Sequence, residues 1–271
     1  MRGAKQTAMT STLRCLHVLE LLAEDPFELG FSSLASILKI PATSVHRVCA
    51  TLLEAGLVER DPVSRLYRLS PKSLWIGSGY LRHSAVYRAA FFPMQDLAKQ
   101  VTGTVQLGIL EDDHVLFIHA VGYPGSSDAF ADVGLRRPLY ATASGKLFLM
   151  EMPPREIERL MLQKLHKFTD GTIVSLGAMQ QELLKTSQNG YATNHEELLP
   201  GYSVIAGPVR NHQGRIVAAI SVTLCSHYLK DNGEAALAAL VQQAAHKASI
   251  QLGLRPGVGF ASNSYASGIA R

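Results

Sequence analysis

The stretch that decides the fold is Thr43-Ser44-Val45-His46-Arg47-Val48-Cys49-Ala50-Thr51-Leu52. Its apolar side chains recur at i, i+3, i+4 and i+7, the spacing of one face of an α-helix. These side chains are Val45, Val48, Cys49 and Leu52. We expect Thr43 to cap this helix and Gly56 to end it in the left-handed conformation that glycine favours. The pattern therefore predicts a helix with one buried stripe and one exposed polar ridge.

The exposed ridge carries small hydrogen-bonding side chains and a single arginine. Its residues are Ser44, His46, Arg47, Ala50 and Thr51. Such residues fit the major groove of DNA, because they reach base edges and bring no negative charge near the phosphates. Arg47 is compatible with either a guanine edge or a phosphate, and the sequence leaves both open. We predict that this is a DNA-recognition helix.

Two helices are expected before this ridge. Leucines repeat at helical spacing from Thr12 onward, until Asp25-Pro26 opposes continuation. A second short helix is predicted over 33–38, with Ser32 as its cap. Its expected buried face is Leu34, Ile37 and Leu38.

A short hairpin is expected after the recognition helix. Residues 57–60 and 66–69 alternate like two strands, and Asp61-Pro62-Val63-Ser64 supplies the turn between them. The tip would carry three residues able to contact phosphates. These are Arg60, Ser64 and Arg65. Three helices followed by a basic hairpin describe a winged helix-turn-helix.

Charge alone does not establish DNA binding. Residues 1–71 hold eight Lys or Arg against seven Asp or Glu, and the whole chain carries a formal charge of +4. A DNA partner is therefore permitted but depends on where the charges lie. Domains of this shape also bind proteins, so a protein-docking role stays open.

A larger domain is expected after Ser70-Pro71. We predict a winged-helix domain at 1–71, a linker helix at 72–85, an effector-binding domain at 86–254 and a mobile tail at 255–271. Trp75 in the linker is expected to pack between domains or subunits. Helical and strand periodicities alternate in the larger part, which predicts an α+β sheet covered on one or both faces. The expected helices are 87–100, 144–150, 156–163 and 233–252, and the expected strands are 104–110, 115–121, 204–210 and 215–224.

The chain carries no motif of catalysis. Gly145-Lys146 lacks the rest of a phosphate loop, since Tyr140 and Leu147 stand where a glycine and a Ser or Thr are needed. Ser144 is no nucleophile elbow, because Thr142 replaces the required glycine. The ten histidines show no metal-ligand spacing. We expect no metal, no cofactor and no enzymatic activity.

Three features predict a soluble cytoplasmic protein. Cys15, Cys49 and Cys225 are far apart in sequence, which favours a reducing compartment and a role as apolar core residues. The first ten residues are polar and lack the apolar run of a signal peptide. The most apolar stretch, 204–224, is interrupted by charged residues and cannot span a membrane.

Several motifs in the same order resemble the IclR family of bacterial transcription regulators. Thr43-Ser44-Val45-His46-Arg47 and the following Leu52–Val58 look like its recognition helix and exit. Ala141–Leu147 is similar to its glycine-lysine signature. Its C-terminal pattern is matched by Gly190-Tyr191-Ala192, Glu196-Glu197, Gly201, Val204–Val209 and Gly214–Val222. The resemblance covers residues 10–253.

The resemblance implies a C-terminal GAF-like effector-binding domain, a homodimer or homotetramer, and binding to double-stranded promoter DNA. It also implies an effector pocket at residues carried over from the family. These are Ser126, Ala129, Ala143, Ser144, Asn194, Tyr202, Val204, Ser221 and Thr223. Some relatives carry an acidic residue where Asn194 and His195 stand here. The implied function is ligand-responsive repression or activation of a catabolic operon.

The polar members of this set are neutral and suit carboxylate or hydroxyl groups. Tyr202, Val204 and Ala129 offer apolar walls. We therefore expect a small organic acid as effector, with aromatic acids among the candidates. The i, i+2 spacing places Ser221 and Thr223 on one face of a strand. This spacing favours the pocket, and the alternative is that both side chains face solvent along the strand. For the function of the domain, the remaining alternative is an enzyme that turns over its ligand.

Overall fold

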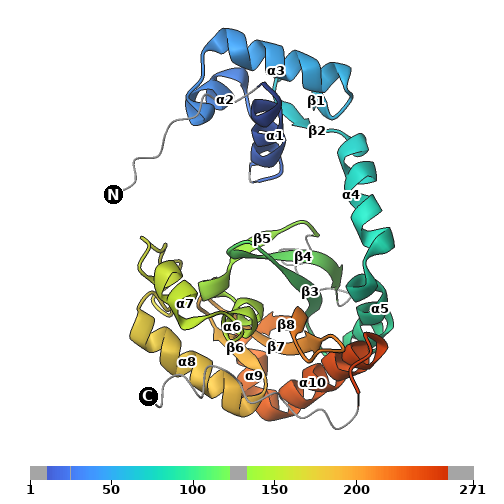
Figure 1. Cartoon of the computed structure of the whole chain (residues 1–271), viewed down its shortest axis with the longest axis vertical. Helices are drawn as coiled ribbons and strands as arrows, with labels where there is room; N and C mark the ends of the chain where they lie inside the picture. Colours follow the sequence, from blue (N-terminus) through green and yellow to red (C-terminus); the bar gives the residue numbers. More distant parts are fainter. Residues whose placement is uncertain (1–10, 25, 123–132, 256–271) are drawn as a thin grey trace. The chain divides into compact units, whose positions relative to one another are not determined.

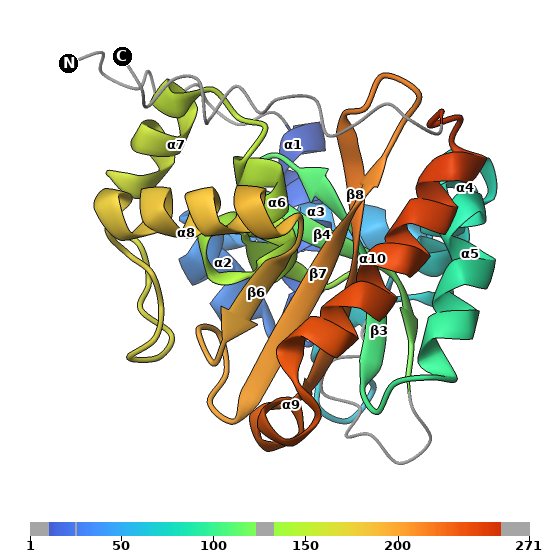
Figure 2. The same ribbon diagram turned by 90° about the horizontal axis from the view of Figure 1, so that it is seen from below.

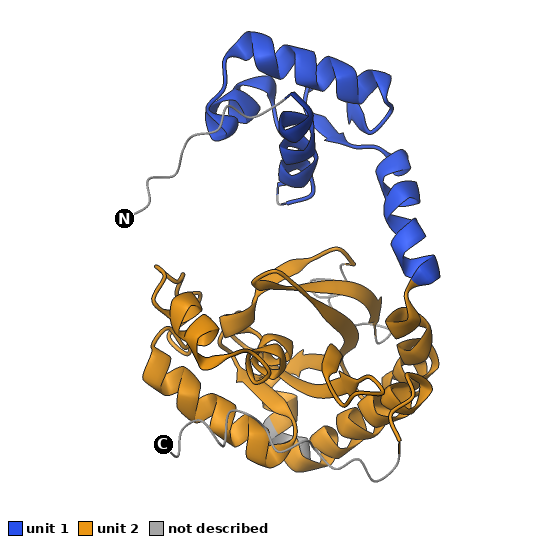
Figure 3. Ribbon diagram, in the orientation of Figure 1, with its two compact units in different colours: residues 1–83 blue, residues 84–271 orange. Residues whose placement is uncertain are grey.

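The computed structural model describes residues 11–24, 26–122 and 133–255. The chain divides into two compact units, Met1–His83 and Ser84–Arg271 (Figure 3). Each unit has its own cluster of buried apolar residues. Residues 72–83 of the predicted linker helix fall inside the first unit, whereas residues 84 and 85 belong to the second. The predicted tail lies, apart from its first residue, outside the described residues.

The first unit is three helices, a two-stranded hairpin and a further helix (Figure 1). In chain order these are α1 (Ser11–Leu22), α2 (Phe31–Leu38), α3 (Ala42–Glu54), β1 (Val58–Arg60), β2 (Tyr67–Leu69) and α4 (Pro71–His83). The strands of the hairpin are antiparallel, with Glu59 opposite Arg68. A winged helix-turn-helix is therefore confirmed as the fold of this unit.

The core of the first unit is built around α3. All four residues of its predicted stripe are buried, as are Val18 and Leu22 of α1. Gly56 follows α3 with φ +69°, so the predicted left-handed end of the helix is also confirmed. The leucine repeat of α1 identified the helix but not its inner face, because Leu13 and Leu16 are exposed.

Three details of the helix ends and faces were predicted wrongly. Gly30 caps α2, so Ser32 lies inside the helix and is not its cap. Of the predicted buried face, Leu34 is fully buried, but Ile37 is 50% exposed. Pro41 caps α3, and its carbonyl accepts the first helical N–H bonds. Thr43 therefore lies inside the first turn and is not the cap. Proline is tolerated at the start of a helix, because a backbone N–H at that position would have no partner.

The second unit is a six-stranded sheet with helices on both faces. Its strand order is β5-β4-β3-β8-β7-β6, and every neighbouring pair is antiparallel. The strands are β3 (Thr104–Glu111), β4 (His114–Val121), β5 (Arg136–Pro138), β6 (Ala192–His195), β7 (Tyr202–Arg210) and β8 (Ile216–Cys225). The helices are α5 (Ala85–Ala98), the short η2 (Leu139–Ala141), α6 (Ala143–Leu149), α7 (Pro154–Met161), α8 (Leu176–Asn189), α9 (Ser226–Asn232) and α10 (Glu234–Gln251).

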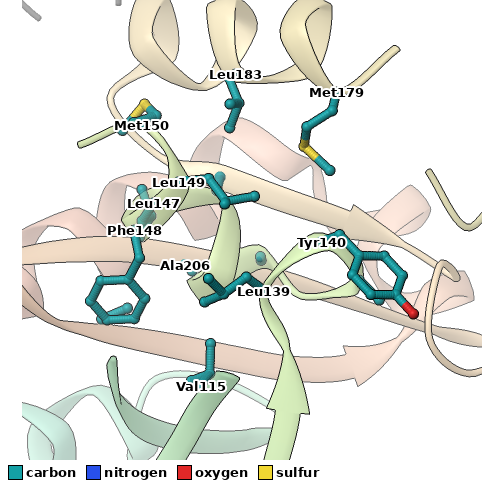
Figure 4. Close-up of a cluster of buried hydrophobic side chains, with 14 of the residues drawn as sticks. Val115, Leu139, Tyr140, Leu147, Phe148, Leu149, Met150, Met179, Leu183 and Ala206 are labelled. Carbon is teal, nitrogen blue, oxygen red and sulfur yellow. The ribbon is translucent and has the colours of Figure 1, made fainter. Parts of the chain in front are cut away.

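The two faces of the sheet are covered differently. The helices α5 and α10 pack together along one face (Figure 2). On the other face α6 packs against β6, β7 and β8, with α8 beyond it. Gly145 permits this packing, because a Cβ there would collide with the backbone of Leu139. Figure 4 shows Leu149 of α6 between Val115 of the sheet and Leu183 of α8.

Most predicted elements of the second unit are present. The hairpin of β7 and β8 joins through residues 211–214 as expected, and the α+β class is confirmed. The sequence interpretation missed the strands β5 and β6 and the helices α8 and α9. Of the three cysteines only Cys49 is buried, whereas Cys225 is exposed, so the expectation of a core role is wrong for Cys225. Among the described residues, no helix is both long and apolar enough to cross a membrane.

Candidate functional site

The outer face of α3 gathers most of the predicted DNA-contacting side chains. Thr43, His46, Arg47 and Thr51 are exposed. The hydroxyl of Thr51 donates to the carbonyl of Arg47 at 3.0 Å, so it is engaged by its own helix. Ser44 is half-buried and accepts a hydrogen bond from Arg14 of α1 at 3.4 Å. Thr43, His46 and Arg47 therefore form the most accessible part of the ridge.

The hairpin tip is held by a carboxylate inside its turn. Asp61 Oδ1 accepts the backbone N–H and the hydroxyl of Ser64, at 2.7 and 3.0 Å. These hydrogen bonds, with the neighbouring amide, hold the pKa of Asp61 below its usual range. Arg65 adopts φ +62° at the tip and is exposed. Arg60 donates to the Arg65 carbonyl at 3.2 Å and lies 5.2 Å from the Tyr67 ring centroid, so it packs within the wing.

A pocket lies in the second unit between the sheet and the segment that begins α6. The space in and around it, including the open solvent at its mouth, amounts to about 500 Å³. Every strand of the six-stranded sheet contributes to its lining. The lining residues are Gln106, Phe117, Leu135, Arg137, Thr142, Ala143, Ser144, Asn194, Leu198, Leu199, Tyr202, Val204, Ser221 and Thr223. This is a concave site for a small molecule, with apolar walls and a few polar groups.

The sheet supplies a polar floor to this pocket. Ser221 and Thr223 are 1% and 4% exposed, so they do not face bulk solvent. Thr223 Oγ1 donates to Gln106 Oε1 at 3.0 Å, across the β3–β8 pair. The Ser221 hydroxyl is buried and has no hydrogen-bond partner among the described residues. Burying a hydroxyl without a hydrogen bond destabilises the folded protein, and a polar ligand atom could supply the missing hydrogen bond.

The opposite wall is fixed by Asn194. This residue is 2% exposed, and its side-chain amide donates to the Ala141 carbonyl at 2.6 Å. Its own oxygen accepts the backbone N–H of Glu197 at 2.9 Å. Asn194 thus ties the segment before α6 to the connection between β6 and β7, and both pieces line the pocket.

Arg137 is the only charged residue lining the pocket in the part of the chain that the structure describes. It lies on β5, opposite Val115 of β4. Its neighbour Arg136 is exposed and pairs with Glu111, with 2.7 Å between nitrogen and oxygen. Its guanidinium is a group that binds carboxylates through charge-assisted hydrogen bonds, so the lining includes a candidate partner for an anion.

Seven of the nine residues named for the effector pocket line this cavity. They are Ala143, Ser144, Asn194, Tyr202, Val204, Ser221 and Thr223. Ser126 and Ala129 lie outside the described residues. Arg137 and Gln106 were missed. A signal for Gln106 did exist, because Thr104 and Gln106 are polar at i, i+2 in an otherwise apolar strand.

In the described ranges, no cluster of three or more His, Cys, Asp or Glu side chains is placed to hold a metal ion. The buried phenol of Tyr140, next to the pocket-lining segment, exchanges hydrogen bonds with the backbone of His166 at 2.9 and 3.1 Å. Burial raises its pKa. Tyr140 is therefore engaged in packing its neighbouring loop.

A winged helix-turn-helix and a pocket-bearing α+β domain on one chain define a ligand-binding transcriptional regulator. The family model described as "IclR helix-turn-helix domain" matches residues 11–62. The family model described as "Bacterial transcriptional regulator IclR C-terminal" matches residues 78–250. The chain belongs to the IclR family of transcriptional regulators. The families and relatives that match are regulators and not enzymes.

Two curated relatives span nearly the whole chain. The HTH-type transcriptional regulator BhcR of Paracoccus denitrificans is 31% identical, over 91% of this chain and 88% of its own. The glycerol operon regulatory protein of Streptomyces coelicolor is 32% identical, over 89% of this chain and 95% of its own. The similarity to these regulators thus extends over both units of the chain.

Solved structures agree in fold. An IclR transcriptional regulator from Alicyclobacillus acidocaldarius has a TM-score of 0.78 at 28% identity, covering 89% of this chain and 98% of its own. An IclR homolog from Microbacterium hydrocarbonoxydans, complexed with 4-hydroxybenzoate, has a TM-score of 0.76 at 24% identity, covering 90% of this chain and 99% of its own. The second likeness concerns the fold alone.

Proposed function

We propose that this protein regulates a catabolic operon and changes its affinity for promoter DNA when a small organic acid binds the pocket of its second unit. The observation that carries the proposal is that one cavity is lined both by Arg137 and by the buried Ser221 hydroxyl, which has no partner among the described residues. An arginine binds a carboxylate through charge-assisted hydrogen bonds. A buried serine hydroxyl then favours a ligand with a second polar group.

The proposed DNA contacts lie on the exposed ridge of α3 and at the hairpin tip. Arg47 and His46 would enter the major groove, while Ser64 and Arg65 would approach phosphates. The remaining proposed contacts are Thr43, Ser44, Thr51 and Arg60. Operon control is supported by relatives such as the protein named for the glycerol operon of S. coelicolor.

The active form is proposed to be a homodimer or a homotetramer. The helix α4 has no buried residue, and it exposes four large apolar side chains. These are Leu74, Trp75, Ile76 and Tyr80, which are 53–75% exposed. A second copy of the chain would cover such a surface. A dimer would place two recognition helices on half-sites about 34 Å apart, or a multiple of that distance.

Calorimetry on the full-length protein tests the effector assignment. The acids glyoxylate, pyruvate, benzoate and 4-hydroxybenzoate are compared with benzamide and benzyl alcohol, which lack the negative charge. We expect at least one acid to bind at one site per chain, with the neutral analogues at least about tenfold weaker. Equal binding of acids and neutral analogues, or binding of none, would contradict the organic-acid assignment.

A further inference from the structure

Lys146 lies two residues after the pocket residue Ser144 and is fully buried, with an exposed fraction of 0%. Its ammonium group has three acceptors. They are Glu182 Oε1 at 2.9 Å, the Thr193 carbonyl at 2.8 Å and Glu197 Oε1 at 2.5 Å. An ammonium has three hydrogens, so every donor of Lys146 is used. One side chain thereby joins α6 to α8, to β6 and to the connection between β6 and β7.

Glu197 is the partner that depends most on this lysine. Its side chain is 7% exposed, and its Oε2 is buried without a hydrogen-bond partner in the described part of the chain. Burial raises the pKa of Glu197, although the nearby Lys146 opposes that shift. A buried carboxylate that loses its cation must take up a proton or move toward water. Lys146 thus holds the carboxylate of Glu197 in its buried position.

The backbone around Glu197 transmits that position to the pocket. The Glu197 N–H donates to Asn194 Oδ1 at 2.9 Å, and its carbonyl accepts the Thr172 hydroxyl at 2.6 Å. Leu198 and Leu199 follow immediately and line the pocket, as does Asn194. A shift of Glu197 would therefore move residues on both sides of it that contact the cavity.

We propose that the Lys146–Glu197 ion pair is a positioning element for the effector pocket: it fixes the wall formed by residues 194–199 and thereby sets the affinity for the effector. The second half of this statement rests on the proposed function, whereas the first half concerns the unliganded protein. Lys146 and Glu197 do not line the cavity, so they act through their neighbours.

The chain offers a matched control in Glu182. This carboxylate bonds the same ammonium group as Glu197. It lies on α8, which does not line the pocket, and its side chain is 18% exposed. Replacing either Glu by Gln removes one negative charge next to the Lys146 ammonium group. Only Glu197→Gln changes the group that belongs to the pocket wall.

Hydrogen exchange on the unliganded full-length protein tests the positioning role directly. We expect Glu197→Gln to accelerate exchange of the amides in 194–202 at least about fivefold, with β7 and β8 beyond residue 204 unchanged. Glu182→Gln should leave 194–202 within about twofold of the original protein. Equal acceleration in both variants, or none in either, would overturn the proposal.

A double variant covers the case in which Glu197→Gln does not fold. Lys146→Met combined with Glu197→Gln removes both charges of the buried pair, and the charge that loses its partner is that of Glu182, whose side chain is 18% exposed. The tie to α6 is still absent, so accelerated exchange at 194–202 is again expected. Exchange in the double variant that matches the original protein would overturn the proposal.

Calorimetry with benzoate and 4-hydroxybenzoate then separates this inference from the proposed function. If either acid binds the original protein, Glu197→Gln should lower the affinity for that acid at least about tenfold, and Glu182→Gln should lower it less than about threefold. An equal loss of affinity in the two variants would overturn the link to the effector. If neither acid binds any form, the choice of acids fails, while the exchange result still decides the positioning role.

Discussion

The side-chain amide of Asn194 donates to the carbonyl of Ala141 at 2.6 Å, while its oxygen accepts the N–H of Glu197 at 2.9 Å. Both halves of the amide are therefore used inside the protein. An acidic residue, which the family resemblance places here in some relatives, has no donor for the Ala141 carbonyl. Asn194 thus acts first as a connector of the pocket walls.

Replacing Asn194 by Asp tests this connection. The Ala141 carbonyl would lose its donor and would face a negative charge, so we expect a loss of about 1–3 kcal/mol in the unfolding free energy of the second unit. Urea unfolding of the full chain, fitted with two transitions, measures it. Asn211→Asp is the control, because Asn211 Oδ1 only accepts backbone N–H groups in a turn. Equal losses in both variants would contradict the account.

Ser221 and Ser203 separate ligand binding from stability. Both serines are buried, but Ser203 shares a 2.8 Å hydrogen bond with Ser226, whereas the Ser221 hydroxyl has no partner in the described chain. Ser221→Ala should leave the unfolding free energy unchanged or raise it, and should weaken the effector about tenfold. Ser203→Ala should cost about 1 kcal/mol and spare the effector. Urea unfolding and calorimetry measure the two effects. The reverse outcome would remove Ser221 from the site.

Arg47 and Arg68 separate DNA contact from surface charge. Arg47 is exposed on the α3 ridge, while Arg68 lies 3.4 Å from Glu28 and 3.5 Å from Glu59. Arg47→Ala should cost about 1–3 kcal/mol of binding to its preferred duplex if it reads a base. If Arg47 holds a phosphate, the affinity for all duplexes should fall by about the same factor. Fluorescence anisotropy on duplexes selected from a random pool measures both. An effect confined to Arg68→Ala would contradict the recognition-helix assignment.

The titration of His119 should make the stability of the second unit depend on pH. Its ring packs between Tyr87 and Phe91, and burial lowers its pKa below the usual 6.5. The unfolded chain therefore binds a proton that the folded chain does not, so stability falls as the pH drops below about 6.5. His119→Phe should reduce the loss measured by urea unfolding between about pH 7.5 and about pH 5.5. An identical loss in both proteins would contradict the assignment.

The sequence predicted the parts that depend on local periodicity. The stripe of Val45, Val48, Cys49 and Leu52 repeats over two full turns, so its buried face could be read without tertiary information. The β7–β8 hairpin was predictable because 211–214 carries strong turn residues. Helix ends were less predictable, since Gly30 and Pro41 cap through backbone geometry and not through a side chain.

The missing parts depend on contacts between distant segments. Arg137 lies between the expected strand 115–121 and the expected helix 144–150, and only strand pairing with β4 places it at the cavity. Lys146 was considered as part of a phosphate-loop motif and as part of the glycine-lysine signature, but not as half of an ion pair. Its carboxylate partners lie 36 and 51 residues away, and no local pattern connects them. The helix α8 was missed because it supplies only Met179, Leu183 and Thr186 to the interior.

The measurement that tests the central claim most directly is the change in DNA affinity when an acid is added. The selected duplex is titrated with the original protein, Arg137→Gln and Arg136→Gln, each with and without the acid that binds most tightly. The acid should shift the duplex affinity of the original protein and of Arg136→Gln by about 5- to 150-fold, and that of Arg137→Gln less than about twofold. An unchanged affinity in the original protein, or an equal shift in Arg137→Gln, would contradict the account.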